Sequence, residues 1–155
     1  MTRKEIAAKV SNYFKIQELV CPDVYKKFGD KSWQFLDTEL LHTLLVLRTE
    51  ILNCGMVIND WVFGGKSTQR GLRCNLCQIV KDKTIKGQLY VSAHCNGAAV
   101  DVVFGSKSGM TAEKARQLIK ANSHLLPYNV RIEKDVTWLH VDVYDTGQKL
   151  FEFDG

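Results

Sequence analysis

Residues 92–104 have the sequence Ser92-Ala-His-Cys-Asn-Gly-Ala-Ala-Val-Asp-Val-Val-Phe104. The apolar run 98–104 predicts a strand that is buried on both faces, and Asp101 lies inside it. A buried carboxylate is costly unless a partner charge, hydrogen bonds or a metal ion compensates it. Gly97 allows a tight turn that brings His94 back over the strand. Two metal ligands could therefore converge here.

A second segment, residues 137–144, offers a third ligand. Its alternation predicts a strand with one apolar face, made of Leu139, Val141 and Val143, and an opposite face made of Trp138, His140 and Asp142. A single histidine is more often an ordinary core or surface residue, but the buried aspartate favours a metal. Zinc takes histidine and carboxylate ligands, and a catalytic site supplies three protein groups and leaves one position to water. The pattern predicts zinc bound by His94, Asp101 and His140, and hydrolysis as the chemistry.

These residues also resemble a known family, the zinc D-Ala-D-Ala carboxypeptidases and peptidoglycan endopeptidases (metallopeptidase family fifteen) of phage or prophage type. The family motif Ser-x-His-x-x-Gly-x-Ala-x-Asp is matched by Ser92, His94, Gly97, Ala99 and Asp101. Residues 138–142 resemble the late motif of the family, which contains the last zinc histidine. Residues 14–22 resemble its N-terminal entry segment, and Gly71-Leu-Arg73 resembles its Gly-Tyr-Arg element. The likeness extends from about Tyr13 to Phe153.

The resemblance implies a Zn²⁺ cofactor and hydrolysis of a peptide bond in bacterial cell-wall peptidoglycan, by carboxypeptidase or endopeptidase action with a zinc-activated water. It implies a stem peptide of peptidoglycan as partner, and a phage endolysin as one setting. We expect one zinc peptidase domain over residues 1–155, acting as a monomer. The expected fold class is α+β, with helices packed against a mainly antiparallel sheet, similar to the Hedgehog and D-Ala-D-Ala-peptidase fold.

By the same resemblance, Arg73 matches the substrate-binding arginine of the family. A guanidinium suits a substrate carboxylate or a developing oxyanion. Arg70 is close enough in sequence to take that role instead, and either arginine could be an ordinary surface cation. Arg70, Ser92 and Trp138 are predicted to contact the substrate.

The general base departs from the family pattern. Many members carry an acid three residues before the last zinc histidine, where this chain has Thr137, which cannot serve. Another branch uses the position five residues before it, and Asp135 is therefore the predicted base. Glu133 and Asp142 are the rivals. Asp142 shares the face of His140 at about 6 to 7 Å along the strand, so it could equally orient a ligand.

A non-catalytic zinc domain that binds cell-wall peptide is the alternative function. Thr137 in place of an acid favours this alternative. Arg73 and the complete motif favour hydrolysis, because an open zinc position has little purely structural rationale.

Composition and charge limit the classes of partner and the location that we expect. The net charge is +4, the hydrophobic content is 45%, and residues 81–86 combine lysines with an aspartate and no aromatic residue. That pattern favours a solvated loop or hairpin over a nucleic-acid site. No apolar run is long enough to span a membrane, and the first residues lack the apolar stretch of a signal peptide. We expect synthesis in the cytoplasm without a signal, and action on the cell wall after phage-type release.

Five cysteines form an odd set, which fits a reduced compartment and no disulfide framework. Cys74 and Cys77 form a Cys-x-x-Cys that could be redox-active or half of a structural zinc site, although loop cysteines are the default interpretation. The nearest candidates to complete such a site are Cys54 and Cys95.

Periodicity and turn residues predict the remaining elements. Helices are expected over residues 4–12, from residue 32 or 33 to about 53, and over residues 112–125 after a cap at Thr111. Strands are expected over residues 56–62, 88–92, 98–104, 129–134, 137–144 and 149–153, the last three as an antiparallel meander.

Overall fold

The computed structural model describes residues 1–155, and its sheet has four strands. In spatial order they are β1 (Ala99–Val102), β3 (Leu139–Asp142), β2 (Val130–Lys134) and β4 (Leu150–Asp154). Strand β3 pairs antiparallel with both β1 and β2, whereas β4 pairs parallel with β2. The α+β class is confirmed, and the sheet is mixed.

The predicted antiparallel meander is right for β2 and β3 and wrong for β4. Both edges of β3 are occupied, by β1 and by β2, so the chain that leaves β3 cannot turn back beside it. Strand β4 instead adds to the free edge of β2 and runs in the same direction as β2.

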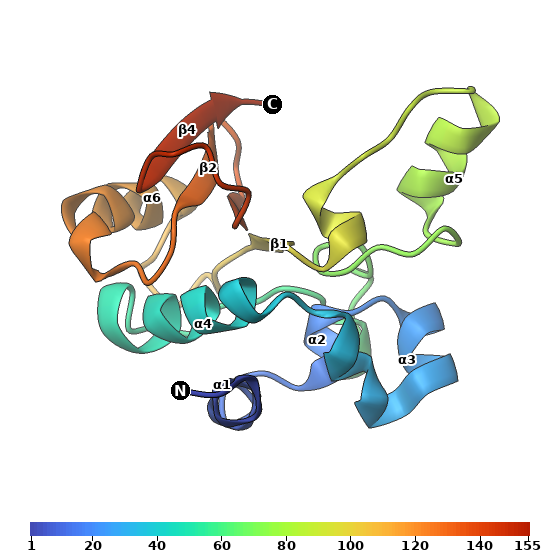
Figure 1. Ribbon diagram of the computed structural model, residues 1–155, viewed down its shortest axis with the longest axis horizontal. Coiled ribbons are helices and arrows are strands. Elements are labelled where there is room, and N and C mark those ends of the chain that lie inside the picture. The colour runs from blue at the N-terminus through green and yellow to red at the C-terminus, as the bar shows by residue number, and fades with distance from the viewer.

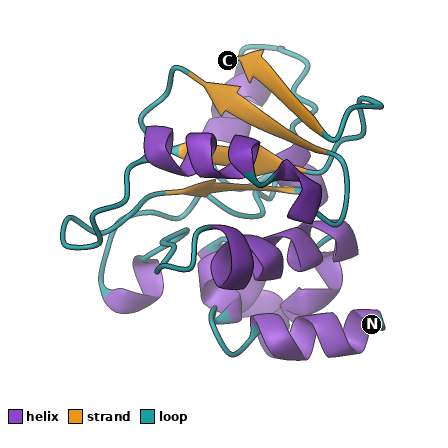
Figure 2. Cartoon of the chain, turned by 90° about the vertical axis from the view of Figure 1, so that its left-hand side faces the viewer, coloured by secondary structure: helices purple, strands orange, loops and turns teal.

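Six α-helices accompany the sheet. They are α1 (Arg3–Val10), α2 (Ile16–Leu19), α3 (Pro22–Phe28), α4 (Thr38–Val46), α5 (Gln78–Ile85) and α6 (Ala112–Ala121). Helix α4 lies between α1 and the strands, and α5 projects from the body (Figure 1). Figure 2 shows the strands above a layer of helices that includes the N-terminal one. Helix α6 contacts β3.

Shorter helical turns connect these elements. Four are 3₁₀ turns, η1 (Gly29–Phe35), η3 (Trp61–Phe63), η4 (Ala93–Asn96) and η5 (Ser123–Leu125), and one is a π turn, η2 (Leu47–Ile51). The sequence had predicted one helix from residue 32 or 33 to about 53. It begins later, because the Asp37 side chain accepts the backbone N–H of Glu39 at 2.7 Å and caps α4. Thr111 caps α6 as predicted.

Three further predictions of local structure are wrong. Residues 56–62 form a single bridge between Val57 and Val103 followed by η3, because the Asn59 side chain bonds the Val20 carbonyl and the Arg70 N–H in place of a strand ladder. Residues 88–92 are irregular. Residues 81–86, predicted as a loop or hairpin, lie largely in α5, where the Ile79 N–H also bonds the Gln69 side chain.

One apolar core joins the helices to the sheet. It contains 34 buried side chains, drawn from α1 at one end of the chain to Val143 at the other. All four residues of β3 are buried, including His140 and Asp142. None of the helices combines the length and the apolar character that a membrane crossing requires.

Candidate metal centre

The pairing of β1 with β3 brings two predicted ligands together. Asp101 lies directly opposite His140 in the antiparallel register. Their side chains meet, with His140 Nδ1 2.8 Å from Asp101 Oδ1. Residues 39 positions apart in sequence are thus cross-strand neighbours.

His94 reaches the same point from the turn η4, just before β1. The Ser92 hydroxyl accepts the His94 N–H at 3.2 Å, and Gly97 ends the turn with φ of +66°. A Cβ at Gly97 would lie 2.0 Å from the Phe35 carbonyl oxygen, so the turn requires glycine for space and for conformation. His94 Nε2 lies 3.2 Å from Asp101 Oδ2.

These three side chains form a compact donor set. Their ligand atoms all lie within 4.8 Å of one another. The side chains of His94, Asp101 and His140 are 3%, 13% and 11% exposed. The structure therefore brings together a largely buried His-Asp-His triad that could bind a metal ion.

Hydrogen bonding fixes which nitrogen of His94 is available. Its Nδ1 lies 2.9 Å from the Gly71 carbonyl oxygen, which can only accept, so Nδ1 carries the proton. Nε2, which lies beside Asp101, is then the nitrogen left for a metal ion. The backbone of Gly71 packs closely against the segment that contains Leu19, since a Cβ at Gly71 would lie 2.3 Å from the Leu19 carbonyl oxygen.

His140 is oriented by a second carboxylate. Its Nε2 lies 2.8 Å from Asp142 Oδ2, and Asp142 is fully buried. Arg131 donates to both oxygens of Asp142 at 2.8 and 2.9 Å, and the Tyr144 N–H donates at 3.1 Å. A carboxylate that holds the outer nitrogen of a histidine is the usual support for a metal-binding imidazole.

The electrostatics follow these contacts. Burial raises the pKa of Asp101, but hydrogen bonds from His140 and His94 outweigh it and hold that pKa well below its usual range. Burial opposes the charged form of His140, yet its bonds to Asp101 and Asp142 raise the pKa to about 9. Burial is likewise outweighed at Asp142, whose pKa is lowered by His140 and Arg131. The centre is a closely packed set of opposite charges.

The three triad residues line an open cavity. The residues that line it besides the triad include Arg73, Ser92, Glu133 and Trp138. An adjoining cavity is lined by Arg70, Lys66, Ile79 and Thr137, and shares Arg73, Asp101 and Trp138 with the first. Trp138 is 37% exposed, so its ring is available to a bound molecule. All the predicted substrate contacts line one of these cavities.

The loop that carries Arg70 and Arg73 is tied to the centre by its backbone. The Arg70 carbonyl accepts the Asp101 N–H at 2.7 Å, and the Arg73 N–H donates to the His94 carbonyl at 3.1 Å. Arg73 donates to Gln69 O and Tyr90 Oη, both at 2.6 Å, and to Asp101 Oδ2 at 3.3 Å. Arg70 instead donates to the Ile58 carbonyl at 3.3 Å. Arg73 is the arginine nearer the triad.

The candidate bases lie in different places. Asp135 is exposed in the turn between β2 and β3, with φ of +62°, and lines neither cavity. Glu133 lines the cavity of the triad. Asp142 also lines it but has both oxygens bonded to Arg131 and one to His140. The geometry brings Glu133 to the triad and leaves Asp135 outside.

Sequence reasoning missed Arg131 and Tyr90. Arg131 lies opposite Asp142 in the register of β2 with β3. Alternation predicted both strands but carries no information on how they align, so nothing in the sequence pairs these two residues. Tyr90 lies in an irregular segment that was predicted as a strand.

Comparison of the chain with protein-family models, with curated proteins and with solved structures finds no match. The interpretation of the site therefore rests on its own geometry. Two imidazoles and one carboxylate are a donor set that zinc accepts, and three protein ligands beside an open cavity leave a fourth position to water, which suits a reactive rather than a purely structural ion.

Proposed function

We propose that this chain is a zinc-dependent peptidase that hydrolyses a peptide bond in bacterial cell-wall peptidoglycan, with a fold of the Hedgehog and D-Ala-D-Ala-peptidase type. The observation that carries the proposal is the convergence of His94, Asp101 and His140 beside an open cavity, with both imidazoles fixed from outside. The motif resemblance supplies the substrate class. The proposed partner is the stem peptide.

His94 Nε2, Asp101 and His140 Nδ1 would hold the zinc ion. Zinc in such a site activates a water molecule and polarises the scissile carbonyl. Hydrogen bonds to the other nitrogen of each histidine orient the imidazoles toward the zinc position. The Gly71 carbonyl holds the proton of His94 on Nδ1, and Asp142 accepts the proton on Nε2 of His140.

Arg73 is proposed to bind the substrate carboxylate or the developing oxyanion. A guanidinium has five N–H donors, and the three contacts of Arg73 leave two of them free. The side chain is 11% exposed and lines both cavities, so these donors can meet a substrate at the triad. Its bonds to Gln69 and Tyr90 hold the guanidinium in place before substrate arrives.

Glu133 is the carboxylate we propose as proton acceptor, in place of the Asp135 that sequence spacing favours. It lines the cavity of the triad, and its carboxylate lies beside Gly155 without a salt bridge or a side-chain hydrogen bond. A general base has to come within hydrogen-bond reach of the proton that it removes, directly or through one water. Glu133 meets that requirement better than a carboxylate in an exposed turn.

Metal analysis combined with mass spectrometry of digested peptidoglycan tests the function. The zinc-loaded protein is expected to release stem-peptide fragments, and the Arg73→Ala variant is expected to retain zinc but to cleave far more slowly. Zinc bound at the triad without any cleavage would contradict the enzyme proposal. That outcome would favour the alternative, a non-catalytic zinc domain that binds cell-wall peptide.

A further inference from the structure

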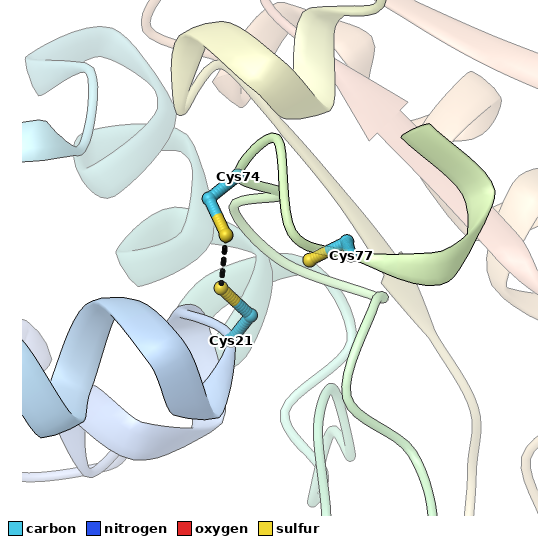
Figure 3. A group of neighbouring side chains, drawn as sticks. All are labelled: Cys21, Cys74 and Cys77. Atoms are coloured by element: carbon cyan, nitrogen blue, oxygen red, sulfur yellow. Dashed lines mark hydrogen bonds between the residues drawn. The ribbon is translucent and has the colours of Figure 1, made fainter. Parts of the chain in front are cut away.

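Three cysteines from two distant segments of the sequence meet on the helical side of the molecule. The sulfur atoms of Cys21, Cys74 and Cys77 all lie within 4.8 Å of one another (Figure 3). The sulfurs of Cys21 and Cys74 lie 3.5 Å apart, and all three cysteines are free thiols. Sequence spacing had offered Cys54 and Cys95 as partners of the Cys-x-x-Cys, and the structure instead brings Cys21.

Backbone contacts hold the two segments together. Val20 and Leu72 form a parallel bridge, in which the Leu72 N–H donates to the Leu19 carbonyl at 2.9 Å and the Cys21 N–H donates to the Leu72 carbonyl at 3.2 Å. Cys21 is thereby fixed beside Leu72, which lies two residues before Cys74. The meeting of the thiols follows from this bridge.

The Cys-x-x-Cys itself is a tight turn. The Cys77 N–H donates to the Cys74 carbonyl at 3.1 Å, and the Leu76 N–H donates to the Cys74 sulfur at 3.4 Å. The two sulfurs therefore point to one side, toward Cys21 (Figure 3). The Leu76 N–H is a donor to the Cys74 sulfur that the sulfur can keep when it binds a metal ion.

Buried cysteines commonly act as small apolar side chains. Two features favour ligation here. Zinc–sulfur bonds of about 2.3 Å at tetrahedral angles place sulfurs about 3.8 Å apart. The Cys21 and Cys74 sulfurs are 3.5 Å apart, and all three sulfurs lie within 4.8 Å of one another. Cys21 and Cys77 are 1% and 6% exposed, while Cys74 also borders a surface cavity that lets solvent reach the cluster.

We propose that Cys21, Cys74 and Cys77 form a second metal site, for a thiophilic divalent cation such as Zn²⁺, with solvent completing its coordination. Three thiolates are a soft donor set that selects such ions over magnesium or calcium. The ion would join the start of α3 to the loop that carries Gly71 and Arg73. The proposal does not depend on the peptidase assignment, because the triad contains no sulfur.

Titration of reduced, metal-free protein with Co²⁺ tests the site through thiolate-to-cobalt charge-transfer absorption in the near ultraviolet. We expect this absorption to saturate at one thiolate-bound cobalt per chain. It is expected to persist in a His94→Ala/His140→Ala double variant, and in Cys54→Ser, whose sulfur lies outside the cluster. It is expected to be lost in Cys74→Ser.

Two results would overturn the proposal. The first is wild-type protein that binds Co²⁺ with no charge-transfer absorption while all five thiols react freely. The second is absorption of unchanged intensity in both Cys74→Ser and Cys77→Ser. Should these variants fail to fold by circular dichroism, zinc analysis of the His94→Ala/His140→Ala double variant decides, with one equivalent expected and none contradicting the site.

Discussion

Gly97 shows how much of the metal centre depends on a single backbone position. Its φ of +66° and its closeness to the Phe35 carbonyl leave no room for a side chain. We predict that Gly97→Ala lowers the free energy of unfolding by about 1–3 kcal/mol, from strain at this position, and weakens zinc binding because His94 shifts with the turn. Denaturant unfolding and calorimetric zinc titration measure the two effects. Gly105→Ala is the control, since Gly105 has nothing within 4 Å of an added Cβ, and a similar loss there would contradict the explanation.

The choice of base is also a question about single residues. We predict that Glu133→Gln lowers kcat by about 10²- to 10⁴-fold, the usual contribution of a general base, while the zinc content stays unchanged. Asp135→Asn is the matched control, since it removes the same charge from a residue outside the cavity. Steady-state hydrolysis of a stem-peptide substrate measures both variants. The reverse result, with Asp135→Asn inactive, would restore the base that sequence spacing favours.

At the level of elements, what the sequence predicted is what local chemistry determines. The apolar run around Asp101 and the alternation around His140 are patterns formed by neighbouring residues. Both strands could therefore be predicted, and their polar residues identified. Register and strand order depend on contacts between distant segments. The parallel β4, the Arg131–Asp142 pair and the meeting of Cys21 with Cys74 therefore escaped prediction. Helix α5 escaped because it buries no residue and so carries no apolar stripe.

The pairing of β2 with β3 supports the metal centre from outside. We predict that Arg131→Met weakens zinc binding by about 10- to 100-fold, as loss of such outer contacts does, because Asp142 loses both guanidinium bonds and holds His140 less firmly. Competition with a chromophoric chelator measures the affinity. Lys134→Met, on the same strand in an exposed ion pair with Asp154, is the control and should leave affinity unchanged. Equal loss in both variants would show a general effect on the strand rather than an effect on Asp142.

On the scale of the whole molecule, the centre joins two parts of the fold. Asp101 and His140 come from the sheet, whereas the Gly71 carbonyl that fixes His94 comes from a loop bridged to the start of α3. The three ligands are all oriented only when these parts are packed together. Metal binding is therefore coupled to folding of the whole chain rather than to one hairpin.

Metal removal tests this coupling. A ligand that binds only the folded state stabilises it by about 4 kcal/mol at a thousandfold excess over Kd, which corresponds to a rise of about 8–16 °C in Tm for a chain of this size. We predict that a chelator lowers the Tm of wild-type protein by an amount of this order and that added zinc restores it. The His94→Ala/His140→Ala and Cys74→Ser variants should each keep part of the shift, and their combination should abolish it. A Tm that does not respond to chelator in wild-type protein would contradict the coupling, because ligands that meet only in the folded chain bind the ion in that state alone.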